Sequence, residues 1–196
     1  MGTDIYYHIQ EKAIEDEREV WMTLENDEDY ESLTHIGRDY LLFSVLADVR
    51  NGHGVAGIRS YDPVEPIAMP RDLPPDSGLD YEYMHSVSYL SFDEILDYFK
   101  EPHTTARYGV ITRQAYESWD GVSSPDSWSL GIGGGSTIVY DAIGKGKGQV
   151  LADDITHVMI SWPVNINEEL DYFKNIIETI KSEHEGELRI VFGFDC

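Results

Sequence analysis

The sequence predicts an α+β fold: one domain, residues 1–196, in which helices pack on a mixed β-sheet. Hydrophobic residues make up 41% of the 196, which is enough for one buried core. Segments with an apolar period of two alternate along the chain with segments of helical period. The C-terminal third reads as a strand-helix-strand unit, and neither an internal repeat nor a linker divides the chain.

Two strands begin the fold. Residues 4–10 and 19–24 are rich in Ile, Tyr and Trp, a composition typical of strands. We expect them to form an antiparallel hairpin with a charged connection over 11–19. Residues 25–31 follow as an acidic loop.

The clearest helix of the first half covers residues 38–51. Asn51-Gly52 is expected to end it, because Asn and Gly tolerate the left-handed conformation of a C-cap. The apolar residues at helical spacing are Leu42, Val45, Leu46 and Val49.

Residues 59–79 are expected to form an irregular, proline-rich arm. Proline fixes φ and lacks an amide donor, so it is unsuited to the interior of a helix or sheet. Loops of this length are uncommon and are often functional. The arm contains five of the eight prolines, namely Pro63, Pro66, Pro70, Pro74 and Pro75.

Two further helices follow the arm. Ser91 is expected to start the first, because Ser91 and Glu94 have the spacing of a capping box, and Pro102 is expected to stop it. A short helix is expected over 112–119. The inward faces of the two helices are Phe92, Ile95, Leu96 and Phe99, then Ala115, Tyr116 and Trp119.

Two strands are expected after the glycine-rich region that follows. They cover residues 136–140 and 155–162, and Pro163 is expected to end the second. In the second strand, alternation places three apolar side chains on one face: Val158, Ile160 and Trp162.

The C-terminal unit is the most regular part of the sequence. Asn167 is the expected N-cap of a helix, and Gly186 its C′ residue. Residues 188–194 are apolar enough for a central strand. If this strand shares a sheet with 155–162, the two would be parallel with a right-handed crossover. The helix has a buried stripe of Leu170, Phe173, Ile177 and Ile180.

Acidic residues outnumber basic ones, 37 against 14, and the net charge is −23. This excess opposes direct binding to DNA, RNA or an anionic membrane, because those partners require clustered Lys and Arg. The excess of acidic residues favours binding to basic partners and electrostatic steering of their association. Aromatic residues interleave with acids over 27–30 and 80–83, so mimicry of nucleic acid is one interpretation. A solvated surface that only maintains solubility is the other.

The N-terminus lacks the basic and apolar regions of a secretory signal. No apolar run approaches the ~20 residues of a membrane-spanning helix. The one cysteine, Cys196, permits no intramolecular disulfide. We therefore expect a cytoplasmic protein that does not contact a membrane.

No catalytic signature is found. Residues 131–136 are glycine-rich, but the Lys of a phosphate-binding loop is missing and a strand, rather than a helix, is expected next. The seven histidines lack the spacing of a helical zinc site, so we predict no metal and no cofactor. A Gly-x-Ser-x-Gly elbow is also missing. Binding is favoured over catalysis, and enzymatic activity is left open.

Polar residues near turns are the candidates for ligand binding. Arginine suits phosphate and carboxylate groups, and glycine amides approach phosphates closely. The alternative for the arginines is ion pairing with the abundant acids. The candidates are Arg38, Arg50, Asn51, His53, Arg71, His85, Ser86, Ser88, Gly133 and Gly134.

Residues 1–5 read Met-Gly-Thr-Asp-Ile, residues 85–90 read His-Ser-Val-Ser-Tyr-Leu, and residues 189–195 read Arg-Ile-Val-Phe-Gly-Phe-Asp. Together with residues 38–52 and 70–74, these segments resemble a family of uncharacterised proteins from bacteriophages, prophages and bacteria. No activity comes with the resemblance. Its phage distribution implies an accessory protein with a host-interaction or anti-defence role.

Three functions remain open. The first is a non-catalytic, acidic phage-type protein that inhibits a host factor, for example in antiviral defence, by protein binding, nucleic-acid mimicry or ligand sequestration. Its partner would be a host protein that is basic or binds nucleic acid, or a small nucleotide signal. The alternative is a nucleotide-binding or nucleotide-processing protein with a pocket built from the candidate residues. A structural component of a phage particle is the third.

Overall fold

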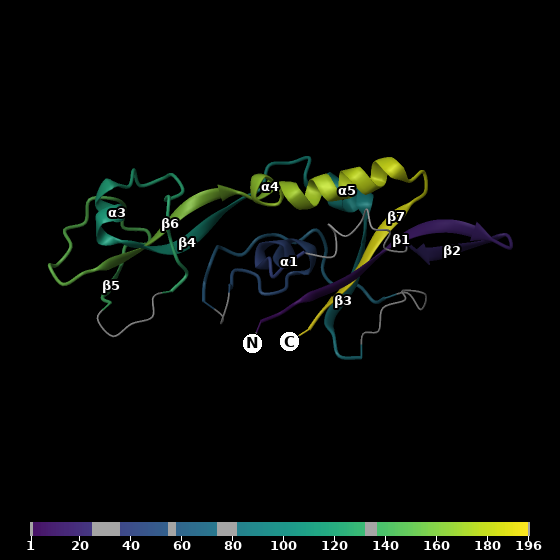
Figure 1. The fold of residues 1–196 in the computed structure, drawn as a ribbon, viewed down its shortest axis with the longest axis horizontal. Coiled ribbons are helices and arrows are strands. Elements are labelled where there is room, and N and C mark those ends of the chain that lie inside the picture. Colours follow the sequence, from purple (N-terminus) through teal and green to yellow (C-terminus); the bar gives the residue numbers. More distant parts are fainter. Residues whose placement is uncertain (1, 25–35, 55–57, 74–81, 132–136, 196) are drawn as a thin grey trace.

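The protein is described by a computed structural model that covers residues 2–24, 36–54, 58–73, 82–131 and 137–195. These residues form two β-sheets and five helices, which confirms the predicted α+β class. Figure 1 shows an elongated molecule with one sheet toward each end of its long axis. We call these ends the first and second lobe. That the chain is one domain stays a prediction.

The first lobe is built on an antiparallel sheet, whose strands in spatial order are β2 (Arg18–Thr23), β1 (Ile5–Glu15), β7 (Leu188–Phe194) and β3 (His85–Ser91). Its helices are α1 (Tyr40–Ala47), α2 (Phe92–Tyr98) and α5 (Asp171–Glu183). β7 lies between two strands and is buried along its whole length, as its apolar sequence predicts. Its side chains Ile190, Phe192 and Phe194 meet those of the helices in one apolar cluster.

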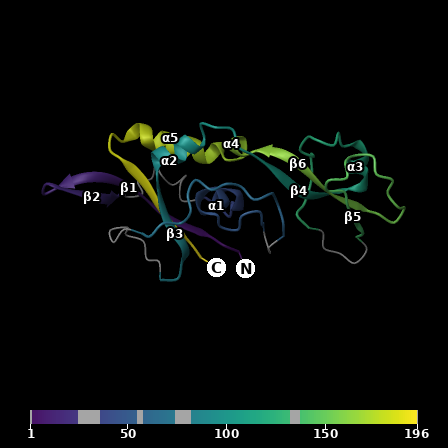
Figure 2. The same cartoon turned by 180° about the vertical axis from the view of Figure 1, so that it is seen from behind.

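The hairpin of β1 and β2 is longer than predicted. The strands pair from Gln10 with Thr23 to Glu15 with Arg18, so the charged connection expected over 11–19 is wrong. Lys12 forms an ion pair with Glu19 of the opposite strand at 2.9 Å, which offsets the charge of the strand residues. β1 pairs with β7 only as far as Glu11, so the rest of the hairpin projects from the sheet (Figures 1 and 2).

The hairpin turn consists of two acidic residues with positive φ. Asp16 has φ 48° and Glu17 has φ 63°, which matches the type I′ turn that suits a two-residue hairpin. Gly and Asn are favoured at such positions because a β-carbon is strained there. This tip therefore holds two negative charges at a conformational cost.

Helix α1 is shorter than the predicted 38–51 and is enclosed on all sides. The side chain of Asp39 caps its start by accepting hydrogen bonds from the amides of Leu41 and Leu42. Asp48 ends it in the left-handed conformation with φ 59°, so Asn51-Gly52 is not its C-cap. All eight residues of the helix are buried, although the sequence predicts only one apolar stripe, because the sheet and the proline-rich arm cover different faces of it.

The second lobe contains a mixed sheet of β4 (Thr104–Thr112), β6 (His157–Asn165) and β5 (Val139–Asp141), with helix α3 (Arg113–Ser118). β4 and β6 are antiparallel, and β5 runs parallel to β6. Val158, Ile160 and Trp162 share one face as predicted, and each is at most 2% exposed. Tyr116 of α3 joins them in a second apolar cluster.

Pro163 does not end its strand. It lies inside β6 opposite Ala106, contrary to the prediction. β5 pairs only with His157–Met159, so at Pro163 β6 has a neighbouring strand on one side among the described residues. A missing amide donor is tolerated at such an edge.

The strand-helix-strand unit of the C-terminal third is confirmed as β6, α4 (Ile166–Glu169), α5 and β7. β6 and β7 lie in different sheets, so the parallel crossover expected of strands in a shared sheet does not arise. Gly186 is not a C′ residue, because α5 ends at His184 in an extended conformation. Its amide donates instead to the Glu11 carboxylate.

The predicted N-cap Asn167 has a different role. The side chain of Asn165 caps α4, and Asn167 holds the loop before β4. Its amide nitrogen donates to the carbonyl of Phe99, and its oxygen accepts from the His103 amide. One-residue shifts of this kind occur because Asn at either position can reach the backbone amides of a helix start.

The described part of the proline-rich arm, 59–73, contains no helix or regular strand. It lies along β4: the Asp62 amide donates to Ala106, the Thr105 hydroxyl to the Asp62 carbonyl, and the Tyr108 amide to Ser60. The arm therefore ties the two lobes together alongside the β4–β6 ribbon.

The capping box at the start of α2 is confirmed. The Ser91 hydroxyl accepts from the Glu94 amide, and the Glu94 carboxylate accepts from the Ser91 amide. We expect Ser91→Ala to lower the free energy of unfolding by about 0.5–2 kcal/mol. Urea denaturation measures the change. Ser182→Ala, on the exposed side of α5, is the control and should change it by less than about 0.5 kcal/mol; equal effects would contradict the role of the box.

Candidate functional site

The predicted ligand-binding residues do not converge. Arg38, Arg50, Asn51 and His53 lie around α1, whereas Arg71, His85, Ser86 and Ser88 lie along β3 and the arm. Gly133 and Gly134 fall outside the described residues. The described candidates therefore do not form the single nucleotide pocket that the alternative function requires.

The two arginines beside α1 hold the N-terminal segment. Arg38 makes two hydrogen bonds with the Asp4 carboxylate, at 2.6 and 2.8 Å. These bonds lower the pKa of Asp4 below its usual value. Arg50 donates to the Thr3 hydroxyl at 2.6 Å, and its guanidinium lies 5.2 Å from the Tyr40 ring centre.

Asn51 and His53 have structural partners as well. The Asn51 side chain donates to the carbonyl of Val64 at 2.7 Å and accepts from the amide of Val64 at 2.9 Å. This two-way contact fixes the arm against the end of α1. Nδ1 of His53 lies 3.1 Å from the Asn51 carbonyl oxygen, at the surface.

The β3 group is organised around an ion pair. Arg71 contacts both carboxylate oxygens of Glu94, at 2.6 and 3.2 Å, and its amide donates to the buried Ser88 hydroxyl. His85 stacks against Phe194 and contacts the Ser86 hydroxyl. The arrangement fastens the arm to β3, which supports the ion-pairing interpretation of these arginines.

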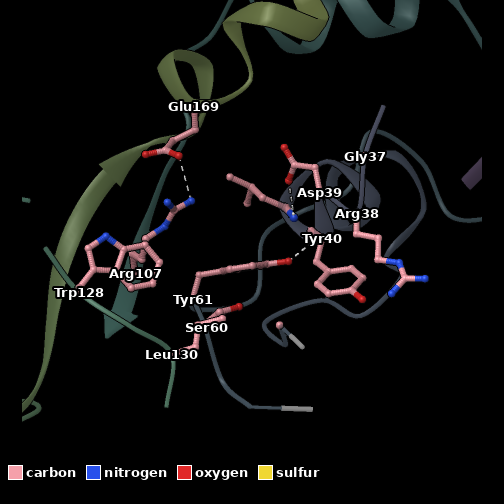
Figure 3. Close-up of a pocket in the computed structure, with 12 residues that line it drawn as sticks. Gly37, Arg38, Asp39, Tyr40, Ser60, Tyr61, Arg107, Trp128, Leu130 and Glu169 are labelled. Atoms are coloured by element: carbon pink, nitrogen blue, oxygen red, sulfur yellow. Dashed lines mark hydrogen bonds and ion pairs between the residues drawn. The ribbon is translucent and has the colours of Figure 1, made fainter. Parts of the chain in front are cut away.

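A cavity of about 510 Å³ lies between the lobes. Its first-lobe wall is the start of α1, residues 37–41, and the opposite wall consists of Arg107 and Trp128 of the second lobe and Glu169 of α4 (Figure 3). Tyr61 of the arm lines the side between them. Of the predicted site residues that the structure describes, only Arg38 borders this cavity, and Figure 3 shows its guanidinium directed away from the other labelled side chains.

The second-lobe wall combines a cation, Arg107, with the indole ring of Trp128. Arg107 Nη2 lies 3.0 Å from Glu169 Oε2, and the guanidinium is 5.7 Å from the Trp128 ring centre. Trp128 in turn packs edge-on against Trp162, with ring centres 5.3 Å apart. Gly109 permits this packing, because a β-carbon there would lie within 3 Å of both indoles.

The first-lobe wall contains a carboxylate, that of Asp39, whose two oxygens already accept hydrogen bonds within the chain. Asp39 caps α1 through one oxygen and accepts from the Tyr172 hydroxyl through the other at 2.9 Å. Burial, and next the Asp39 charge, raise the pKa of Tyr172 above its usual range. Tyr61 donates to the Tyr40 carbonyl, and burial raises the pKa of Tyr61 to about 12. These hydroxyls are therefore fixed hydrogen-bond donors at neutral pH.

Sequence reasoning missed Arg107 and Trp128. Arg107 lies mid-strand, and its partner Glu169 is far away in the sequence, so no local motif marks the pair. The available signal was Gly109 inside an otherwise bulky strand, since glycine in a strand marks a close approach of other groups.

Most basic side chains are neutralised within the chain. Nine of the 14 form salt bridges with carboxylates of the described residues: Lys12, Arg38, Arg59, Arg71, Lys100, Arg107, Arg113, Lys174 and Lys181. Many of the remaining carboxylates of the described residues are exposed. In the same described part of the chain, no cluster of His, Cys, Asp and Glu has metal-binding geometry. Nor does that part contain a helix with the length and apolarity needed to cross a bilayer.

Comparisons with known proteins add no relative: no family model, no curated protein and no solved structure matches this chain.

We expect Asn51 to be needed for stability. Asn51→Ala removes both contacts with Val64 and should lower the free energy of unfolding by about 1–3 kcal/mol, because partly buried backbone groups lose their partners. Urea denaturation provides the measurement. Asn175→Ala, which removes an exposed side-chain contact on α5, is the matched control. An unchanged midpoint for Asn51→Ala would show that the contact is not structural.

The Arg71–Glu94 pair predicts a pH dependence. Hydrogen bonds from Arg71 hold the pKa of Glu94 below its ordinary value of 4.5, so the ionised form stabilises the fold. This stabilisation is complete above the unfolded-state pKa and is lost as the pH falls through the lower folded-state pKa. The stability difference between wild type and Glu94→Gln should therefore be present at pH 7 and shrink below pH 4.5. When Arg71 is also replaced by Gln, the stability difference caused by Glu94→Gln should no longer depend on pH. If the pH dependence persists in that background, it arises from groups other than the Arg71–Glu94 pair.

Proposed function

We propose that this protein is a non-catalytic acidic binder that engages a basic host protein and inhibits it. The observation that carries the proposal is the internal neutralisation of its cations. Most Lys and Arg side chains are already paired, and many of the remaining carboxylates of the described residues are exposed, in a chain whose net charge is −23. Such a surface attracts cationic partners and accelerates their association.

The projecting hairpin supports protein binding as the mode of action. Its tip holds Asp16 and Glu17 at positive φ, where Asn-Gly would be more stable. Strained residues at a projecting position are a feature of functional surfaces. Ile14, near the tip, is 79% exposed, so the hairpin offers an apolar contact beside the charges.

The partner class follows from charge and from the resemblance to phage and prophage proteins. Both favour a bacterial host protein that is basic or that binds nucleic acid. Nucleotide binding through the predicted arginines receives less support, because Arg38, Arg50 and Arg71 each have a partner within the chain. Inhibition by occupying a nucleic-acid-binding surface remains part of the proposal.

The test uses the double variant Asp16→Asn/Glu17→Gly, which removes both charges and relieves the turn. We expect its free energy of unfolding to rise by about 0.5–1 kcal/mol, whereas binding should weaken. Partners retained from bacterial lysate on the immobilised chain at low salt are identified and purified. Their association rates are then measured over a salt gradient for wild type and variant.

Asp153→Asn/Asp154→Asn is the matched control, because it removes the same charge from an exposed turn of the second lobe. The hairpin variant should slow association more than the control, and added salt should reduce the difference. If no purified partner binds directly, or if binding does not depend on salt, the proposal fails. Release of the partner by competing DNA would identify nucleic-acid mimicry as the mechanism.

A further inference from the structure

The cavity between the lobes has the composition of a ligand site, independently of the acidic surface. Its volume of about 510 Å³ lies within the usual range for small-molecule pockets, which form preferentially between structural units. Its walls come from three separate parts of the chain: the start of α1, the arm, and the β4 side of the second lobe (Figure 3).

Arg107 is the residue of the cavity wall that suits a negatively charged group on a ligand. Its guanidinium is planar, presents five N–H donors, and suits a carboxylate or phosphate held through two bonds. One terminal nitrogen of the guanidinium forms the ion pair with Glu169, and the Arg107 side chain is 20% exposed. The guanidinium is therefore placed at the cavity wall with donors beyond those that Glu169 uses.

Aromatic and apolar side chains supply a surface for a ring. Trp128 and Tyr61 line the cavity together with Leu41 and Leu130. Flat aromatic ligands stack on such rings with a preference for offset or edge-on geometry. Ser60, also at the wall, is 7% exposed and its hydroxyl has no hydrogen-bond partner within the described chain. A buried polar group in this state is unusual and fits a group that a ligand satisfies.

Charge limits what the cavity accepts. Asp39 and Glu169 line the same space as Arg107, and the whole chain is strongly negative, so a polyanion is repelled. A single negative charge can share the guanidinium with Glu169 through the N–H donors that the ion pair leaves available. We propose that the cavity binds a planar ring that carries one negative charge, either a cyclic nucleotide or an aromatic carboxylate, with the anion on Arg107 and the ring between Trp128 and Tyr61.

Isothermal titration calorimetry on the full chain tests the proposal with four probes. Cyclic AMP has an aromatic ring and one negative charge, which lies on its phosphodiester. Indole-3-acetate also has an aromatic ring and one negative charge, which lies on its carboxylate. Adenosine has the ring without the charge, and ATP has the ring with several charges. We expect saturable binding of cyclic AMP or indole-3-acetate at concentrations up to about 5 mM, with adenosine and ATP weaker. Which of the two probes binds identifies the source of the anion.

Two variants locate the site. Arg107→Gln should weaken the binding probe by about tenfold or more, because the charge-assisted contact is lost. Gly37→Trp should abolish binding, because Gly37 lines the cavity and a β-carbon there meets no atom within 4 Å, which leaves room for a larger side chain to begin at this position. This variant keeps the test valid if Arg107→Gln unfolds.

Arg113→Gln is the control, because it removes an arginine ion pair of the same lobe away from the cavity. Binding that survives in Arg113→Gln and disappears in Gly37→Trp supports the site. The proposal is overturned if no probe binds, if Gly37→Trp binds like wild type, or if adenosine binds as tightly as the charged probes.

Discussion

The pairing of β4 with β6 is the contact on which the remaining structure depends. The two strands run side by side over nine residues each, from Thr104 opposite Asn165 to Thr112 opposite His157. One end of this ribbon contributes Val158 and Trp162 to the second apolar cluster, and the chain then continues through Ile166 into the first. The ribbon thereby sets the spacing of the lobes. The cavity exists because this spacing brings Arg107 and Trp128 opposite the start of α1.

The sequence predicts well those features that depend on local pattern. The stripe of Leu170, Phe173 and Ile177, the capping box at Ser91 and the central position of residues 188–194 each follow from spacing and composition within one segment. The sequence-based predictions fail where a segment distant in the sequence, rather than the local pattern, determines the structure. Glu11–Glu15 look like a loop because of their charge, yet a facing strand pairs with them. Pro163 looks like a strand end, yet it lies inside β6, at a position where β6 has a neighbouring strand on one side among the described residues.

The candidate site is harder to predict for the same reason. Arg38 and Arg71 look available because their partners, Asp4 and Glu94, are 34 and 23 residues away. In a chain with so many acids, sequence alone cannot say which carboxylate a given arginine meets. Arg107 was overlooked because strand position gives no hint that its side chain faces a cavity formed by a distant helix.

The ends of the described chain are placed in a way that affects its response to force. Ile5 pairs with Phe194, and the Asp195 amide donates to the Asp4 carbonyl at 3.2 Å, so the outer ends of antiparallel β1 and β7 lie side by side. Tension applied between residues 2 and 195 would load the hydrogen bonds of this pair one after another, as in a zipper, rather than all together in shear. Pulling the molecule by these points should therefore peel open the sheet at its central strand, with low resistance, while the remote ribbon bears little of the load.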